Sequence, residues 1–272
     1  MRRRPFARCL LPLTLAFLLG APPAWAAVTP ITRRSAIGGD VYWWSARRSG
    51  SVIALVPFFH YEIVRNVYFD AQLPFAPYFG PTTSFGLGNP TAGAHYAASI
   101  FEDRITFFIG GRASIPLASV DSRGWQNANA AAATGLVYYD TYLWAIDYFP
   151  FGATAGIEAN PVDPLWLRAT VDPTFYVPTR RVRHFEGIIQ NRFEAELQSA
   201  VGVGGGLGFQ AVLEGIYPGD NAQFAAEPFF SFDNDKFFLR AGLLVALDRP
   251  LGFGFDRGKV ATLHINIGGD LK

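Results

Sequence analysis

The sequence predicts an all-β protein, a transmembrane antiparallel up-and-down β-barrel of about twelve strands with a short helix in one extracellular loop. Three observations predict this class: a secretory signal at the start, two-residue alternation of apolar and polar residues after it, and connections that alternate between short and long. The composition agrees, because only 17% of the residues are charged, against about 25% in a typical soluble domain. A net charge of +1 argues against a nucleic-acid partner.

Residues 1–26 are the expected signal peptide, and residues 27–272 are the expected barrel domain. Four arginines precede an apolar core at Leu10–Leu19, and Ala24–Ala26 supplies an A-x-A cleavage site. This apolar run is shorter than the about 20 residues that a membrane-spanning helix needs. Cleavage removes the only cysteine and the only methionine, so we expect no disulfide and no thiol chemistry in the mature chain.

Two-residue alternation is the period of a β-strand with two different faces. In Trp166–Val177 the odd-numbered residues are apolar, whereas the even-numbered residues include Arg168 and Asp172. About twelve such segments recur, each roughly as long as a tilted strand that crosses a bilayer. The segments begin near Ala36, Val52, Val67, Asn89, Ile105, Ala153, Trp166, Gly187, Leu207, Phe224, Phe237 and Lys259.

The connections between these segments alternate in length. Short turns are expected at residues 65–66, 102–103, 160–163, 202–206 and 233–236, and longer connections at 75–88, 116–152, 178–185, 218–222 and 248–258. Short periplasmic turns and long extracellular loops are typical of outer-membrane barrels. A secreted β-sandwich also alternates, but aromatic residues gather at strand ends here, which favours the interfacial girdles of a barrel.

The polar faces of the strands are expected to line the interior if the apolar faces meet lipid. These side chains either pair across strands and hold a small barrel together, or line a water-filled passage and set its selectivity. The candidates for selectivity are His60, Glu62, His95, Arg112, Arg168, Asp172, Arg192, Glu194, Glu196, Arg240 and His264. Other polar residues on the same faces are Asp40, Asp70, Arg104, Glu158, Glu214 and Glu227.

Catalytic and metal-binding patterns are missing from the sequence. There is no G-x-S-x-G elbow for a serine nucleophile, and no two histidines have the spacing of metal ligands. His60 and Glu62 lie two residues apart on one face, and we expect an interior hydrogen-bonded pair. The run Gly202–Gly208 fails the G-x-G-x-x-G spacing and predicts a turn. The sequence therefore predicts no enzyme, no cofactor and no metal site.

The segment 127–151 fits the barrel pattern least well. Alanines followed by aromatic residues at i, i+3 and i+4 suit a short amphipathic helix. The helix would either cap the rim or fold into the mouth and narrow it, and an ordinary loop on the membrane interface is the alternative. The candidates for such a constriction are Tyr138, Asp140, Tyr142, Trp144 and Asp147.

One short stretch has a resemblance to a known family. Phe85–Tyr96 reads FGLGNPTAGAHY and resembles the GLGDPTLG-x-x-Y element of the outer-membrane barrels of the MetA-pathway of phenol degradation family, with Asn89 in place of the usual Asp. The resemblance implies an outer-membrane channel or transporter for hydrophobic or aromatic compounds, without catalytic residues. The chain departs from most outer-membrane barrels at its last residue, Lys272, where a terminal aromatic is common.

These observations together predict a monomeric barrel in the outer membrane of a Gram-negative bacterium. Its expected function is passive passage of a small hydrophobic or aromatic solute. Its expected partners are outer-membrane lipid, periplasmic chaperones and the barrel-assembly machinery. The alternative is a structural or adhesion-type barrel that has a filled lumen and no transport.

Overall fold

The computed structural model describes residues 33–46, 50–80, 83–101, 103–118, 128, 132, 140–181, 184–217, 220–234, 236–247 and 261–271, with only the backbone at 46, 214–217 and 220–221. The predicted signal peptide, Tyr138 and Lys272 lie outside these residues. In the described part of the chain, no helix has the length and apolar character needed to cross a membrane.

Antiparallel strands make up almost all of the described structure. They are β1 (Ala36–Ala46), β2 (Gly50–Val64), β3 (Val67–Gln72), β4 (Phe75–Phe79), β5 (Ser84–Leu87), β6 (Thr91–Ile100), β7 (Ile105–Ser114), β8 (Tyr148–Val162), β9 (Leu165–Pro178), β10 (Glu186–Gln198), β11 (Val203–Tyr217), β12 (Asp220–Asp233), β13 (Phe237–Ala246) and β14 (Ala261–Asp270). The connection between β7 and β8 contains a single-turn 3-10 helix, η2 (Thr141–Trp144).

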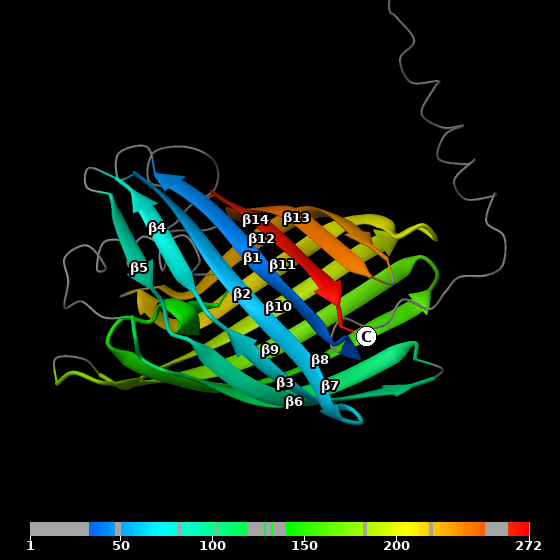
Figure 1. Ribbon diagram of the computed structural model, residues 1–272, viewed down its shortest axis with the longest axis horizontal. Coiled ribbons are helices and arrows are strands. Elements are labelled where there is room, and N and C mark those ends of the chain that lie inside the picture. The colour runs from blue at the N-terminus through cyan, green and yellow to red at the C-terminus, as the bar shows by residue number, and fades with distance from the viewer. Residues whose placement is uncertain are drawn as a thin grey trace, which may run out of the picture.

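The sheet closes on itself, because β1 pairs with β14 on one side and with β2 on the other. Within the described residues, twelve strands form this ring and the short β4 and β5 form a hairpin beside β2 (Figure 1). The predicted fold class, an antiparallel barrel of about twelve strands, is therefore confirmed. A sandwich of two separate sheets is excluded by the closed hydrogen-bonding ring.

The two ends of the barrel differ in their connections. At one end, called the short-turn end here, tight turns join β2 to β3, β6 to β7, β8 to β9, β10 to β11 and β12 to β13. The turn residues Asn66, Asp103 and Gly202 have φ angles of 65°, 65° and 81°, which Asn, Asp and Gly tolerate better than branched residues. The start of β1 and the end of β14 also lie at this end (Figure 1). The opposite end, the long-loop end, carries the β4–β5 hairpin and η2.

Several predicted boundaries are wrong. The expected long connection at 75–88 contains the β4–β5 hairpin. Pro74 prevents β3 from continuing, but the chain after it still runs beside β2, and β4 pairs with β2 there. β8 begins at Tyr148, inside the stretch predicted as helix, since Tyr148 and Pro150 point inward and alternate with exposed Phe149 and Phe151. The expected long connection at 218–222 is short, because Tyr217 already pairs with Asp220. The connection at 248–258 lies outside the described residues.

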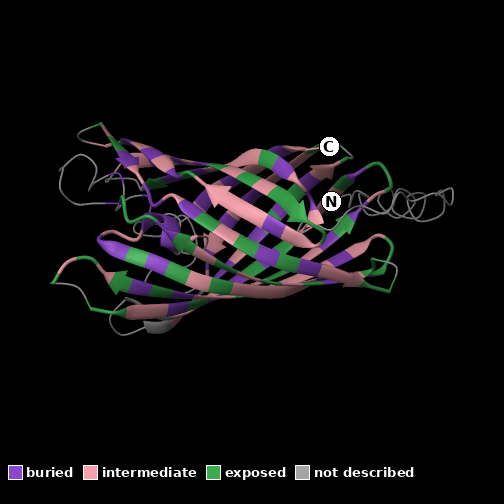
Figure 2. Ribbon diagram, turned by 60° about the horizontal axis from the view of Figure 1, so that its bottom comes forward, coloured by how far each residue is buried: buried purple, intermediate pink, exposed green. Residues whose placement is uncertain are grey.

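Burial alternates along the strands with a period of two, as Figure 2 shows by its changing colours. The outward residues are apolar and exposed, for example Trp43, Ile109 and Leu207. The inward residues are polar towards the short-turn end and apolar towards the long-loop end. The predicted arrangement, with apolar faces outside and polar side chains inside, therefore describes only one half of the lumen.

Candidate functional site in the lumen

A cavity of about 480 Å³ lies inside the barrel. Its walls extend from Tyr42 and Arg112 near the middle to Arg34 and Asp233 at the short-turn end. Asp140 and Tyr142, from the connection between β7 and β8, also contact the cavity. The cavity therefore lies between the short-turn end and a segment of chain that enters the barrel from the long-loop end.

A network of ion pairs covers one side of the cavity. Arg168 on β9 lies 2.6 Å from Glu196, 3.7 Å from Glu194 and 3.6 Å from Glu158. Arg240 on β13 lies 2.8 Å from Glu194 and 3.3 Å from Glu227 of β12. The charges of this network are buried from bulk solvent, which favours pairing over free ions.

Glycines on β11 make room for this network. The predicted turn at the glycine run is wrong, because the turn ends at Gly202 and the following glycines belong to β11. A Cβ at Gly206 would lie 2.7 Å from the ring of Phe229, and that ring carries the guanidinium of Arg240 3.7 Å from its centroid. The bare backbone of β11 thus lets Arg240 of β13 reach Glu194 of β10 across the two strands between them, β11 and β12.

His264 continues the network onto β14. Its Nε2 lies 2.9 Å from Asp40 and its Nδ1 lies 3.0 Å from Glu227. The imidazole stacks on Tyr42, with 4.6 Å between ring centroids. Near the short-turn end, the two guanidinium nitrogens of Arg34 each donate to one oxygen of Asp233, at 3.0 Å.

A second polar group lies on β2, β3 and β6. The carboxylate of Asp70 accepts hydrogen bonds from two histidines, with Oδ1 2.5 Å from Nδ1 of His60 and Oδ2 2.8 Å from Nδ1 of His95. The predicted pair of His60 with Glu62 is wrong. Asp70 faces His60 directly across the β2–β3 register, whereas Glu62 is exposed and accepts a hydrogen bond from the backbone of Asn66 at the turn.

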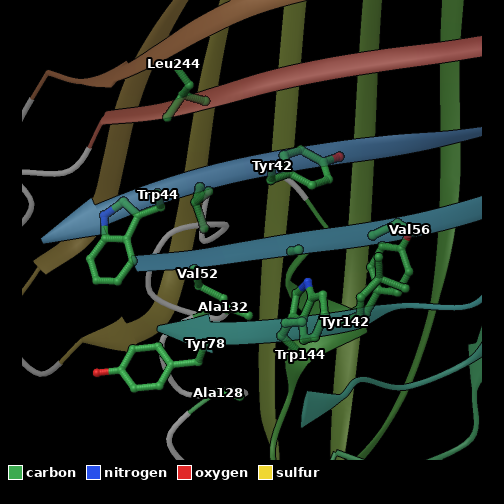
Figure 3. Close-up of a cluster of buried hydrophobic side chains, with 14 of the residues drawn as sticks. Tyr42, Trp44, Val52, Val56, Tyr78, Ala128, Ala132, Tyr142, Trp144 and Leu244 are labelled. Carbon is green, nitrogen blue, oxygen red and sulfur yellow. The ribbon is translucent and has the colours of Figure 1, made fainter. Parts of the chain in front are cut away.

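The connection between β7 and β8 enters the mouth of the barrel. Leu143 and Trp144 are each only 1% exposed, and they pack with Ala128, Ala132 and inward residues of the surrounding strands. Figure 3 draws this cluster at the long-loop end, with Trp144 and Tyr142 beside β2 and β4. Leu143 and Trp144 of the connection therefore lie packed inside the mouth. The helical positions Ala128 and Ala132 lie in a stretch that is otherwise outside the described residues.

Asn89 attaches this connection to the barrel wall. Its Nδ2 donates to the carbonyls of Tyr142 at 3.0 Å and Ala145 at 2.9 Å, and its Oδ1 accepts from the backbone of Ala118 at 2.8 Å. Its own backbone N–H donates to Leu143 at 2.7 Å. The side chain of Asn89 is fully buried, so these bonds have no competition from water.

Gly88 permits this close approach. A Cβ at Gly88 would lie 2.5 Å from the carbonyl oxygen of Leu143 and 3.0 Å from the ring of Trp144. The GLGNP stretch, recognised from its sequence, is thus the part of the wall that receives the inserted connection. Sequence reasoning missed this role because nothing local indicates which segment packs on Gly88.

Tyr142 and Asp140 form the boundary between the inserted connection and the cavity. The hydroxyl of Tyr142 donates to Gln72 at 2.8 Å, and the guanidinium of Arg112 lies 3.9 Å from its ring centroid. Burial raises the pKa of Asp140 above its ordinary value, although Arg192 and Arg112 act in the opposite direction. Burial and the nearby Asp140 also raise the pKa of Tyr142 well above its ordinary value.

The other constriction candidates lie elsewhere. Trp144 belongs to the apolar cluster rather than to the cavity wall. Asp147 is buried and its carboxylate lies 3.1 Å from Nε of Arg180, which ties the connection to the loop after β9. Tyr138 lies outside the described residues.

Most of the polar residues selected from the sequence do contact the cavity, because the two-residue period fixes which face points inward. The selectivity candidates on its wall are His60, His95, Arg112, Arg168, Arg192, Glu194, Glu196, Arg240 and His264. Asp172 lies beside them, 3.4 Å from Arg112, and Glu62 lies at the short-turn end. Arg34 and Gln72, which the sequence pattern does not single out, also contact the cavity.

Solved structures with a similar fold include an outer membrane channel and a porin. An outer membrane channel from Pseudomonas putida F1 aligns with a TM-score of 0.59 and 11% identity, over 93% of this chain and 100% of the channel. The NanC porin aligns with a TM-score of 0.50 and 9% identity, over 86% of this chain and 99% of the porin. No family model and no curated protein matches the sequence. At such low identities, the likeness shows the fold alone.

Proposed function

We propose that this protein is an outer-membrane channel through which a small hydrophobic or aromatic solute passes, with the inserted connection as its gate. The observation that carries the proposal is the cavity of about 480 Å³ inside a closed barrel, directly below the inserted connection. The outward belt of exposed apolar side chains supports a place in a membrane. The two similar structures are themselves described as an outer membrane channel and a porin.

The two halves of the lumen support the class of solute. The half at the long-loop end presents aromatic and aliphatic side chains, among them Tyr42, Trp44 and Tyr176. The cavity below presents the guanidinium groups of Arg112 and Arg192. An aromatic ring matches the apolar half, and a carboxylate on that ring matches a guanidinium of the cavity wall, which carries five arginines and seven Asp or Glu side chains. An aromatic carboxylate is therefore the first solute to test.

The resemblance of Phe85–Tyr96 to the MetA-pathway family supports the same class. In this chain Gly88 and Asn89 of that stretch hold the inserted connection. No catalytic role is proposed.

The alternative is a structural barrel with a filled lumen. The buried ion pairs of Arg168 and Arg240, together with Leu143 and Trp144 in the mouth, favour it. The two functions differ in one respect: a gate must leave the mouth at times, whereas a filler must not.

Single-channel conductance in a planar bilayer separates these functions. Mature protein refolded in detergent would be measured with and without benzoate, and its strand content would be checked by circular dichroism. Discrete current steps that benzoate reduces are expected for the proposed channel. A correctly folded, inserted barrel that gives no current under any voltage would overturn the proposal and leave the structural alternative.

A further inference from the structure

Three side chains that commonly bind metals meet on the lumen wall. They are His60 of β2, Asp70 of β3 and His95 of β6, on three strands that follow one another around the barrel. All three contact the cavity. No spacing in the sequence indicates this group, because strand register rather than a local motif brings the residues together.

The distances suit a single small ion. One ligand atom from each residue lies within 4.8 Å of the others. The carboxylate of Asp70 now lies between the two Nδ1 atoms, 2.5 Å from His60 and 2.8 Å from His95. Zinc bonds of about 2.0–2.1 Å in a tetrahedron place ligand atoms roughly 3.3 Å apart. Binding therefore opens these two contacts by less than an ångström and brings any ligand atoms that are now 4.8 Å apart about 1.5 Å closer together.

Aromatic stacking holds the two imidazoles in place. The ring of Tyr68 lies 5.0 Å from that of His60 and 5.1 Å from that of His95, and the two imidazoles are 5.0 Å apart. Gly110 on β7 lets His95 lie close to the wall, since a Cβ there would be 2.5 Å from that of His95. Rings fixed in this way lose little freedom when they bind an ion, which favours affinity.

The carboxylate of the group is accessible from the cavity. The side chain of Asp70 is 38% exposed, whereas His60 and His95 are 16% and 9% exposed. Nε2 of His60 is buried and has no hydrogen-bond partner. An ion that enters the cavity therefore reaches the carboxylate first and still leaves positions for water.

We propose that His60, Asp70 and His95 bind one divalent transition-metal ion of the Zn²⁺ class on the lumen wall. Two imidazoles with one carboxylate suit Zn²⁺, Ni²⁺ or Cu²⁺, whereas Mg²⁺ and Ca²⁺ prefer sites made of oxygen ligands alone. Such an ion adds positive charge to the cavity beside Arg112 and so favours an anionic solute. The proposal does not depend on transport, because binding is measured on the folded barrel alone.

Isothermal titration of Zn²⁺ into the folded, detergent-solubilised protein tests the site. We expect one Zn²⁺ per barrel, and no displacement of it by excess Mg²⁺. Asp70→Asn and His95→Gln each remove one ligand and should weaken binding at least about tenfold. His184→Gln is the matched control, because His184 is exposed in the connection between β9 and β10, and its removal should leave Zn²⁺ binding as it is.

Folding of each variant would be checked by strand content and by its heat-modifiable migration on a gel. If Asp70→Asn fails to fold, His60→Gln replaces it, since glutamine retains a hydrogen-bond donor for Asp70. The site is refuted if folded wild-type protein binds no Zn²⁺, or if folded variants at Asp70 and His95 bind it as tightly as wild type. In either case the three residues form a hydrogen-bonded group only.

Discussion

Replacing Asn89 by aspartate tests whether one amide holds the inserted connection in the mouth of the barrel. The two side chains have nearly the same shape, but the carboxylate has no N–H to donate. In the wild type, Nδ2 of Asn89 donates to the carbonyls of Tyr142 and Ala145, at 3.0 and 2.9 Å. The substitution removes both hydrogen bonds and places a negative oxygen against two carbonyl oxygens. The bond from the Ala118 backbone to Oδ1 is retained.

The cost follows from the complete burial of Asn89. A buried polar group that loses its partner costs about 1–3 kcal/mol, so two lost bonds cost roughly 2–6 kcal/mol. Because each 1.4 kcal/mol changes an equilibrium tenfold, the ratio of docked to undocked connection should fall by about 30-fold or more. The strands of the barrel should remain, since Asn89 lies between β5 and β6 and not within a strand.

Two measurements report the undocked state. Limited proteolysis of folded protein should cut the connection between β7 and β8 faster in Asn89→Asp than in wild type, and the fraction of time spent conducting in a planar bilayer should rise. Asn234→Asp is the matched control. Oδ1 of Asn234 only accepts bonds, from the backbone of Lys236 and Phe237 at the short-turn end, and a carboxylate accepts them as well. Equal cleavage rates and equal open fractions in the two variants would refute the role of Asn89.

Three further predictions concern the cavity and its boundary. Arg112→Gln removes one cation from the wall and should raise the ratio of cation to anion permeability roughly fivefold, or by about 1 kcal/mol. The reversal potential in a salt gradient measures this ratio. An unchanged reversal potential would show that the permeating ions do not pass Arg112. Gly206→Val should destabilise the folded barrel by about 1–3 kcal/mol in urea, because its Cβ meets the backbone carbonyl of Ala195 and the ring of Phe229. Gly205→Ala, on the outward face, should cost less, because its Cβ meets only the carbonyl oxygen of Phe229, at 3.2 Å. Acidification should close the channel, because burial raises the pKa of Asp140 when the connection is docked. The docked state therefore binds more protons than the undocked state. It gains stability as the pH falls through the raised pKa towards the ordinary value of 3.8. Conductance recorded against pH checks this, and Asp140→Asn should remove the dependence.

The strands and the inward faces were predictable because they depend on a local pattern. A period of two assigns every residue of a strand to one face once a single residue is placed. Arg168 and Glu196 were therefore recognised as interior residues from alternation alone, and both contact the cavity. Turns are predictable from local sequence only where the backbone conformation favours a particular residue type, as the positive φ of Asn66 does.

Pairings between strands were not predictable in this way. His60 was matched with Glu62 because the two are neighbours on one face, but its partner Asp70 comes from the register of the next strand. Glycine is common in turns, so the sequence predicts a turn at the glycines of β11. In the structure these glycines lie beneath Phe229 and Arg240. Such choices depend on what lies opposite, which a single sequence does not show.

β6 and the residues just before it connect the two unusual features of this lumen. Gly88 and Asn89 receive the inserted connection, and His95 lies on the inward face of the strand that follows them. A strand paired on both sides transmits a displacement along its length better than a loop does, because ladder hydrogen bonds fix its neighbours. An ion bound to His95 and the inserted connection held by Asn89 would therefore act on opposite ends of the same short, rigid segment, residues 89–95. Zn²⁺ should accordingly change the open fraction of the wild-type channel and leave that of His95→Gln unaltered.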